Sequence, residues 1–225
     1  MRPDLLPTFC TILLAAAITA PGCQSGSSSS FDRYSIRGDA DEKFAKGADR
    51  PPTVHTLHAM ARLLAAQGQD AQCAAVLSTL LKDHPKFLPA HVDLAELYMR
   101  TEQVDKAITA LGEARKLAPE DPVLLNNLGM CRMMKSQYDV ALDLFIAAVD
   151  LAPRNTRYRA NAATALGMLG KYDQALKAYE QMLGPAQAHY NLAVLCEARS
   201  DPDRAALEFA RARSLGFLAP RSVSP

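Results

Sequence analysis

One pattern of small and large residues recurs along the chain at an offset of 34 residues, which shortens to 30 before the last copy. Within 122–155, apolar residues fall at helical spacing in two blocks separated by a polar break at 135–139, which predicts two short amphipathic helices and a turn. Asp121 and Pro122 are suited to begin the first helix, and Pro153 to end the second. A short helix hairpin that repeats in this way cannot bury its apolar face alone, so neighbouring copies must stack.

The repeated positions hold the same class of side chain in every copy. Small residues, which allow two helices to approach closely, occupy one slot of each helix, and a large residue fills the space between them. This arrangement predicts closely packed helix pairs. The first small slot holds Ala61, Ala95, Gly129, Ala163 and Ala193, the second holds Cys73, Ala107, Ala141, Ala175 and Ala205, and the large slot holds Leu77, Leu111, Phe145, Tyr179 and Phe209.

This pattern, with Pro85, Pro119 and Pro153 closing three of the copies, resembles the tetratricopeptide repeat (TPR). The resemblance implies an all-α fold, a right-handed α-solenoid of about five TPR helix-turn-helix units. The solenoid is expected to span 54–219, with units that start at residues 54, 88, 122, 156 and 186.

The first 22 residues have the composition of a secretion leader. Arg2 precedes an apolar run over 9–20, which is shorter than the roughly 20 apolar residues of a membrane span, and we interpret 1–22 as a signal peptide. The stretch Ala20-Pro21-Gly22-Cys23 resembles the lipobox of bacterial lipoproteins. This resemblance implies lipidation of Cys23, whereas an ordinary cleaved signal with a coincidental cysteine is the alternative.

The residues after the cysteine favour an anchored domain. A serine-rich run over 24–30 is typical of a flexible tether, and we interpret 23–52 as a lipidated flexible tether and linker. The lipoprotein resemblance, with Gln24 after the cysteine, implies the bacterial cell envelope, at the outer membrane facing the periplasm. The membrane would then be contacted through the lipid anchor only.

We expect no complete capping helix after Gly216, at the end of the last repeat. Terminal repeats of solenoids need a polar outer face. We therefore expect Glu208, Arg211 and Arg213 to solvate this end, and 220–225 to form a loose tail.

Charge and motif content argue against several classes of protein. The 25 basic and 24 acidic residues nearly cancel, which disfavours nucleic acid as a partner. The sequence has no HExxH, no GxSxG, no phosphate-binding glycine loop and no metal-ligand spacing, so we expect no enzyme, cofactor, metal or small-molecule substrate. Cys73, Cys131 and Cys196 are predicted to be buried packing residues, and His55 and His58 to be solvated at the surface.

A solenoid of short helices offers grooves, and we therefore expect a binding surface. In TPR proteins the first helix of each unit lines the concave face, and this resemblance assigns the peptide-binding positions. Asn127, Asn161 and Asn191 share the sixth position, where a ladder of carboxamides can pair with the backbone of an extended peptide. The predicted peptide-binding residues are Asn126, Asn127, Met130, Met133, Met134, Arg157, Asn161, Met168, Tyr190 and Asn191.

Each part of this predicted site has an alternative interpretation. The asparagines can bond across adjacent helices or face water, and methionines at helical spacing can fill core gaps. Arg154, Arg157 and Arg159 are better interpreted as solvated arginines than as a carboxylate clamp, because the clamp's lysine position holds no lysine in this chain.

The leader, tether and repeats together resemble envelope TPR lipoproteins, and 126–129 and 171–179 resemble the tight-adherence (Flp) and type IV pilus assembly subgroup. This resemblance implies a scaffold that binds a protein or peptide partner in its concave groove during pilus or secretion-system assembly. A general periplasmic peptide-binding adaptor or chaperone is one alternative. A regulator of an envelope enzyme is the other.

Overall fold

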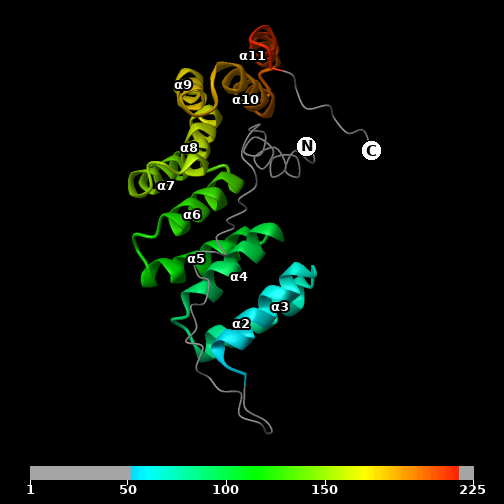
Figure 1. The fold of residues 1–225 in the computed structure, drawn as a ribbon, viewed down its shortest axis with the longest axis vertical. Coiled ribbons are helices and arrows are strands. Elements are labelled where there is room, and N and C mark those ends of the chain that lie inside the picture. The colour runs from blue at the N-terminus through cyan, green and yellow to red at the C-terminus, as the bar shows by residue number, and fades with distance from the viewer. Residues whose placement is uncertain (1–51, 218–225) are drawn as a thin grey trace. The chain divides into compact units, whose positions relative to one another are not determined.

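The structure, a computed structural model, describes residues 52–217. All regular secondary structure in this range is α-helical, which confirms the expected all-α solenoid of helix hairpins (Figure 1). The predicted signal peptide, Cys23 and the tail at 220–225 lie outside the described residues. The helices of residues 52–217 are α2 (Val54–Ala66), α3 (Asp70–Asp83), α4 (Leu88–Arg100), α5 (Val104–Leu117), α6 (Pro122–Met134), α7 (Tyr138–Leu151), α8 (Thr156–Met168), α9 (Tyr172–Leu183), α10 (Pro185–Ala198) and α11 (Pro202–Ser214).

The first helix of each repeat begins at or next to the residue that the sequence pattern indicates. Four of the expected starts coincide with the first residues of α2, α4, α6 and α8, and α10 begins one residue before the fifth. This difference arises at Gly184, whose φ of 80° turns the chain from α9 directly into α10. Pro185 takes the first helical position, where a missing backbone N–H costs no hydrogen bond.

Local side chains explain where two of the helices begin. The Asp121 carboxylate accepts a 2.8 Å hydrogen bond from the backbone N–H of Val123 at the start of α6. The Asp201 carboxylate accepts one of 3.2 Å from the backbone N–H of Arg204 at the start of α11. Each aspartate precedes a proline at the first helical position. Capping of this kind contributes about 1 kcal/mol to a helix, so these boundaries are set by the nearby sequence.

Residues 52–124 and 125–217 form two compact units. In the first unit, α2 packs on α3, α3 on α4, and α4 on α5. In the second, each helix from α7 to α11 packs on the next, and α8 also contacts α10. The repeated hairpins therefore stack within each unit by contacts between sequence neighbours, as expected for a solenoid.

Small residues allow the helices of a pair to meet. The alanine in the small slot of α2, α4, α8 and α10 has no exposed surface. In α6 that slot is Gly129, where an added Cβ would lie 2.5 Å from the Phe145 ring. Phe145 is itself fully buried on α7, so a larger residue at Gly129 would force the ring to move.

A buried carboxylate occupies the last repeat, where the sequence pattern predicts a solvated one. Glu208 has no exposed surface, and its oxygens lie 2.6 Å from Nδ1 of His189, 3.1 Å from Nε of Arg204 and 3.2 Å from a terminal guanidinium nitrogen of Arg211. The expectation that Glu208 solvates the end of the unit is therefore wrong, because these nitrogens replace water around the charge. Arg211 and Arg213 are exposed, as expected.

Candidate functional site

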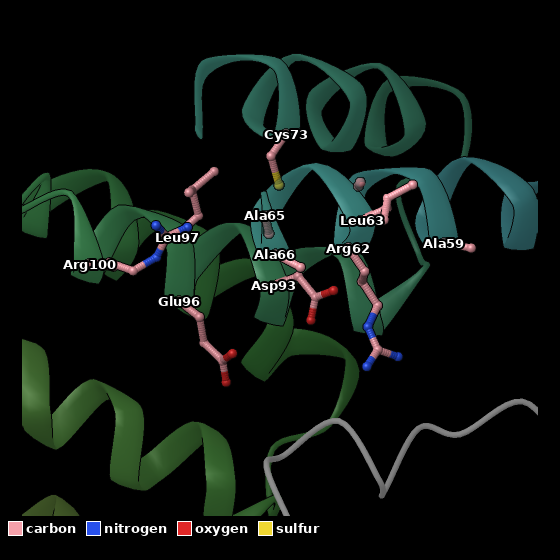
Figure 2. A pocket seen from close by; sticks show the side chains of 11 residues that line it. Ala59, Arg62, Leu63, Ala65, Ala66, Cys73, Asp93, Glu96, Leu97 and Arg100 are labelled. Atoms are coloured by element: carbon pink, nitrogen blue, oxygen red, sulfur yellow. The ribbon is translucent and has the colours of Figure 1, made fainter. Parts of the chain in front are cut away.

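A groove of about 740 Å³ lies along the first helices of repeats one and two (Figure 2). Each of the four lining residues of α4 lies 34 positions after a lining residue of α2, so equivalent positions of the two repeats line much of the groove. Cys73 of α3 also contributes. The groove is lined by Ala59, Ala61, Arg62, Leu63, Ala65 and Ala66 on α2, and by Asp93, Glu96, Leu97 and Arg100 on α4.

The groove combines apolar and charged side chains. Leu63 is 59% exposed, whereas Leu97, the equivalent lining residue of α4, is buried. Figure 2 shows the side chains of Arg62, Asp93 and Glu96 extending from α2 and α4 on the same side of these helices. An apolar surface flanked by both signs of charge suits a polypeptide segment that brings its own apolar and charged residues.

A buried contact holds the two helices that line the groove. Nε2 of His58 on α2 lies 2.7 Å from a carboxylate oxygen of Asp93 on α4. The Phe87 ring packs edge-on against His58, with centroids 5.2 Å apart. The prediction of a solvated His58 is therefore wrong, because Asp93 and Phe87 enclose the imidazole; His55 is exposed, as predicted.

The predicted asparagine ladder lies in residues 125–217, and its members are buried. Nδ2 of Asn161 on α8 donates a 2.7 Å hydrogen bond to Oδ1 of Asn126 on α6. Nδ2 of Asn126 in turn donates to Oδ1 of Asn127 at 3.3 Å. Asn161 therefore bonds across adjacent helices, which is one of the alternatives considered from sequence, and the role of these amides in peptide binding stays a prediction.

Asn191 on α10 differs from the other ladder residues. Its side chain is 1% exposed, and neither its amide nitrogen nor its amide oxygen has a hydrogen-bond partner. In repeat four, the residue at the position of Asn126 is Ala160, which has no polar side-chain atom. The alanine at this position explains why Asn191 lacks the hydrogen bond that Asn161 makes to Asn126.

The remaining predicted residues divide between the core and the surface. Met133 and Met168 are 4% exposed and belong to the core of the second unit, while Met130 and Met134 are half-buried. Tyr190 is also half-buried, and its ring packs against Phe209 and Phe217. Arg157 is exposed. Ligand contact thus remains a prediction for all of these side chains, and the two core methionines would have to become accessible for it.

The chemical environment of the thiols does not favour reaction. Cys73, Cys131 and Cys196 are free and buried, as predicted. Burial raises the pKa of all three thiols, that of Cys131 to about 11, so the nucleophilic thiolate is disfavoured near neutral pH. Within residues 52–217, no group of three or more His, Cys, Asp or Glu side chains could hold a metal ion. The helices of that range are too short or too polar to cross a membrane.

Family models described as tetratricopeptide repeat match residues 64–128, 128–187 and 160–219. Together these matches extend over well more than half of the 225 residues. The chain belongs to the tetratricopeptide repeat family. It is accordingly a TPR scaffold for protein–protein interaction.

Two curated proteins share part of this repeat region. The protein O-mannosyl-transferases TMTC1 of Mus musculus and Homo sapiens are each 27% identical over 129 residues, which is 56% of this chain. The aligned region is only 14% and 15% of those proteins, respectively. The similarity therefore does not establish catalysis in the TPR chain.

Solved structures share the fold. The MamA protein superposes with a TM-score of 0.59 and 18% identity, covering 74% of this chain and 97% of MamA. YrrB, described as a TPR protein with an unusual peptide-binding site, has a TM-score of 0.58 and 22% identity over 73% of this chain and 87% of YrrB. A TPR protein from Parabacteroides merdae has a TM-score of 0.55 and 18% identity over 76% and 81% of the two chains. At these identities the likeness shows the fold alone.

The peptide-binding residues predicted from sequence lie in repeats three to five, whereas the groove lies in repeats one and two. The repeat register contained the signal. Moving back 34 residues from Asn127 leads to Asp93, so a polar residue already occupied the ladder position in repeat two. His58 is predicted from sequence to be solvated, whereas its partner Asp93 lies 35 positions away on the next repeat.

Proposed function

We propose that this chain is an outer-membrane-anchored TPR scaffold lipoprotein that binds a protein partner during pilus or secretion-system assembly. The groove between α2 and α4 carries the binding part of the proposal, because Leu63 offers exposed apolar surface beside charged residues. YrrB, a structural relative, is described as having a peptide-binding site. The lipobox resemblance at 20–23 and the serine-rich run at 24–30 support the anchor.

Recovery of crosslinked complexes from cell envelopes tests the binding part. The bait is the full chain, compared with Leu63→Glu in the groove and with Ser78→Glu on the exposed surface of α3. Both substitutions place a carboxylate at an exposed position, so both variants should fold. The proposal expects Leu63→Glu to lose a partner that the wild type and Ser78→Glu retain. Equal recovery by all three proteins would exclude the groove.

Processing of the leader tests the anchor. Globomycin, which blocks the lipoprotein signal peptidase, should cause an unprocessed form to accumulate, and Cys23→Ala should abolish the acylated form and its membrane fractionation. Normal maturation in globomycin, with the chain released by osmotic shock, would favour an ordinary cleaved signal. This outcome would leave the groove experiment valid.

The identity of the captured protein separates the pilus proposal from its two alternatives. A secretin or another pilus component, encoded beside a secretion ATPase, supports assembly. Many unrelated extended polypeptides would support a general periplasmic peptide-binding adaptor or chaperone. A single hydrolase or protease of the envelope would support a regulator of an envelope enzyme.

A further inference from the structure

One face of α2 carries apolar side chains that are exposed to solvent. Met60 is 51% exposed, and Thr56, one turn earlier on the same side of the helix, is exposed as well. Leu63, which also lines the groove, lies one turn after Met60 on this side. Thr56, Met60 and Leu63 together are called the α2 face below.

The equivalent face is buried on other first helices of the chain. Its three residues are at most 8% exposed on α4 and at most 4% exposed on α10, namely Ala90, Leu94 and Leu97 on α4 and Ala188, Leu192 and Leu195 on α10. Both helices pack on the second helix of the preceding repeat, α4 on α3 and α10 on α9. Residues 52–217 contain no helix before α2. The α2 face thus lies where a preceding second helix would pack.

The sequence directly before α2 has the pattern of such a second helix. Three of its residues match the second small slot, the large slot and the closing proline of repeat one. Ala40, Phe44 and Pro52 each lie 33 positions before these residues, which are Cys73, Leu77 and Pro85. The common offset is one less than 34, so the connection to α2 is one residue shorter than the connections at Pro85 and Pro119. Residues 39–52 therefore match the second half of a repeat.

Helix signals surround the matching residues. Asp39 is suited to cap a helix that begins at Ala40, with Glu42 three residues after the cap, and Pro51 is suited to end it. The pattern predicts a helix over 40–49. A helix this short is marginal in isolation, and Gly47 weakens it further. It therefore needs an apolar surface to pack against.

We propose that residues 40–49 form a helix that covers the α2 face and supplies the second helix of an incomplete repeat. The segment leads directly into α2, and Phe44 and Met60 each lie eight positions from Pro52, so an antiparallel hairpin brings these two side chains together. Contact between an aromatic ring and a thioether is favourable. The short connection keeps the segment at a high effective concentration beside α2, which favours it over a second copy or another protein.

The groove remains accessible in this arrangement. Leu63 lies toward the other end of the hairpin, beside Ala40, whose side chain is too small to cover it fully. Met60 does not line the groove, so the contact can be tested there without changing the groove. The inference is independent of the proposed partner and of the lipid anchor, and it would confine the flexible tether to 23–38.

Hydrogen exchange of the purified full chain in mild detergent, followed by mass spectrometry, tests the proposal. Backbone amides of 44–49 should exchange at least about tenfold more slowly than in an unstructured chain. Met60→Glu places a carboxylate beside Phe44 and should abolish this protection, while the amides of α4 and α5 stay protected and show that the repeats are folded. Ile146→Glu is the matched control, because Ile146 is 46% exposed on α7, and it should leave the protection of 44–49 unchanged.

Phe44→Glu tests the same contact from the other side. It alters only the segment before the repeats, and it should also abolish the protection of 44–49. Unprotected amides over 44–49 in the wild type, or protection that survives Met60→Glu, would overturn the proposal. Protection that increases with protein concentration would assign the α2 face to a second copy, and protection that requires another envelope protein would assign it to a partner. Either result would overturn the proposal as well.

Discussion

Asn161 and Asn126 join adjacent repeats through a 2.7 Å hydrogen bond between their side-chain amides. The two residues are 35 positions apart, and so are His58 and Asp93, which meet at 2.7 Å in the other unit. Each contact connects the fifth position of one repeat to the sixth position of the next. These side chains therefore form buried polar links between neighbouring first helices, and the link depends on a polar residue at the fifth position.

The link between Asn126 and Asn161 should stabilise the fold. Asn161→Ala leaves the amide oxygen of Asn126 without its buried donor, so we expect the free energy of unfolding in urea to fall by about 1 to 3 kcal/mol. A double-mutant cycle with Asn126→Ala should give a coupling energy of about 1 kcal/mol. Arg157→Ala, at an exposed position of the same helix, should change stability by less than about 0.5 kcal/mol. Additive losses with no coupling would show that the bond contributes little.

The isolated amide of Asn191 can be given a partner. Ala160→Asn places an amide at the position equivalent to Asn126, from which it can accept a hydrogen bond from Asn191. The change should raise the free energy of unfolding by roughly 1 kcal/mol, even though asparagine is a poorer helix former than alanine. The same change in an Asn191→Leu background should lower stability, since no partner remains. Urea denaturation of the four proteins measures both effects, and an equal effect in the two backgrounds would contradict the proposed pairing.

Two glycines on helices should respond oppositely to alanine. In Gly129→Ala the new Cβ would meet the buried Phe145 ring at 2.5 Å, so we expect a loss of about 1 to 3 kcal/mol from overpacking. At Gly112 on α5 nothing lies within 4 Å of the added Cβ. Gly112→Ala should therefore stabilise the protein by about 1 kcal/mol through helix propensity. Thermal and urea unfolding of both variants check the contrast, which fails if Gly129→Ala is as stable as the wild type.

Alkaline pH should destabilise the protein through Cys131. Burial raises the pKa of this thiol from about 9 to about 11, so the unfolded chain loses the proton at a lower pH than the folded chain. Stability contributed by the neutral thiol is complete below pH 9 and is lost as the pH rises through 11. At about 1.4 kcal/mol per pKa unit, the total loss is roughly 2 to 3 kcal/mol.

Cys131→Ala isolates that contribution, because Cys73, Cys196 and the tyrosines remain. The difference in unfolding free energy between wild type and Cys131→Ala should be constant below pH 9 and shrink toward pH 11. A difference that stays constant across this range would contradict the alkaline titration of a buried thiol.

The helix pairs could be predicted from sequence because their determinants are local and repeat. Asp121 with Pro122 and Asp201 with Pro202 mark helix starts whose hydrogen bonds involve residues two or three positions away. The recurrence of the small and large slots in every copy then implies stacking. Gly184 shortens the connection to the next helix, and the sequence shows this as well.

The polar contacts could not be predicted because they depend on which residue the neighbouring repeat places opposite. Asn161 and Asn191 occupy equivalent positions. Asn161 donates a hydrogen bond to Asn126 of the preceding repeat, whereas the equivalent residue before Asn191 is Ala160, which leaves the amide of Asn191 without a partner. His58 and Glu208 look like solvated residues in sequence, but distant partners surround both in the fold. Burial of a polar side chain is thus a pairwise property that a single helix does not reveal.

Site-specific photo-crosslinking in living cells tests the central claim, that this TPR chain binds a protein partner in the α2–α4 groove. A photoreactive amino acid replaces Leu63 in the groove in one strain and the exposed Ser78 of α3 in another. We predict a discrete crosslinked protein from the Leu63 position and none from the Ser78 position. Crosslinking to the same proteins from both positions, or only from Ser78, would contradict the account.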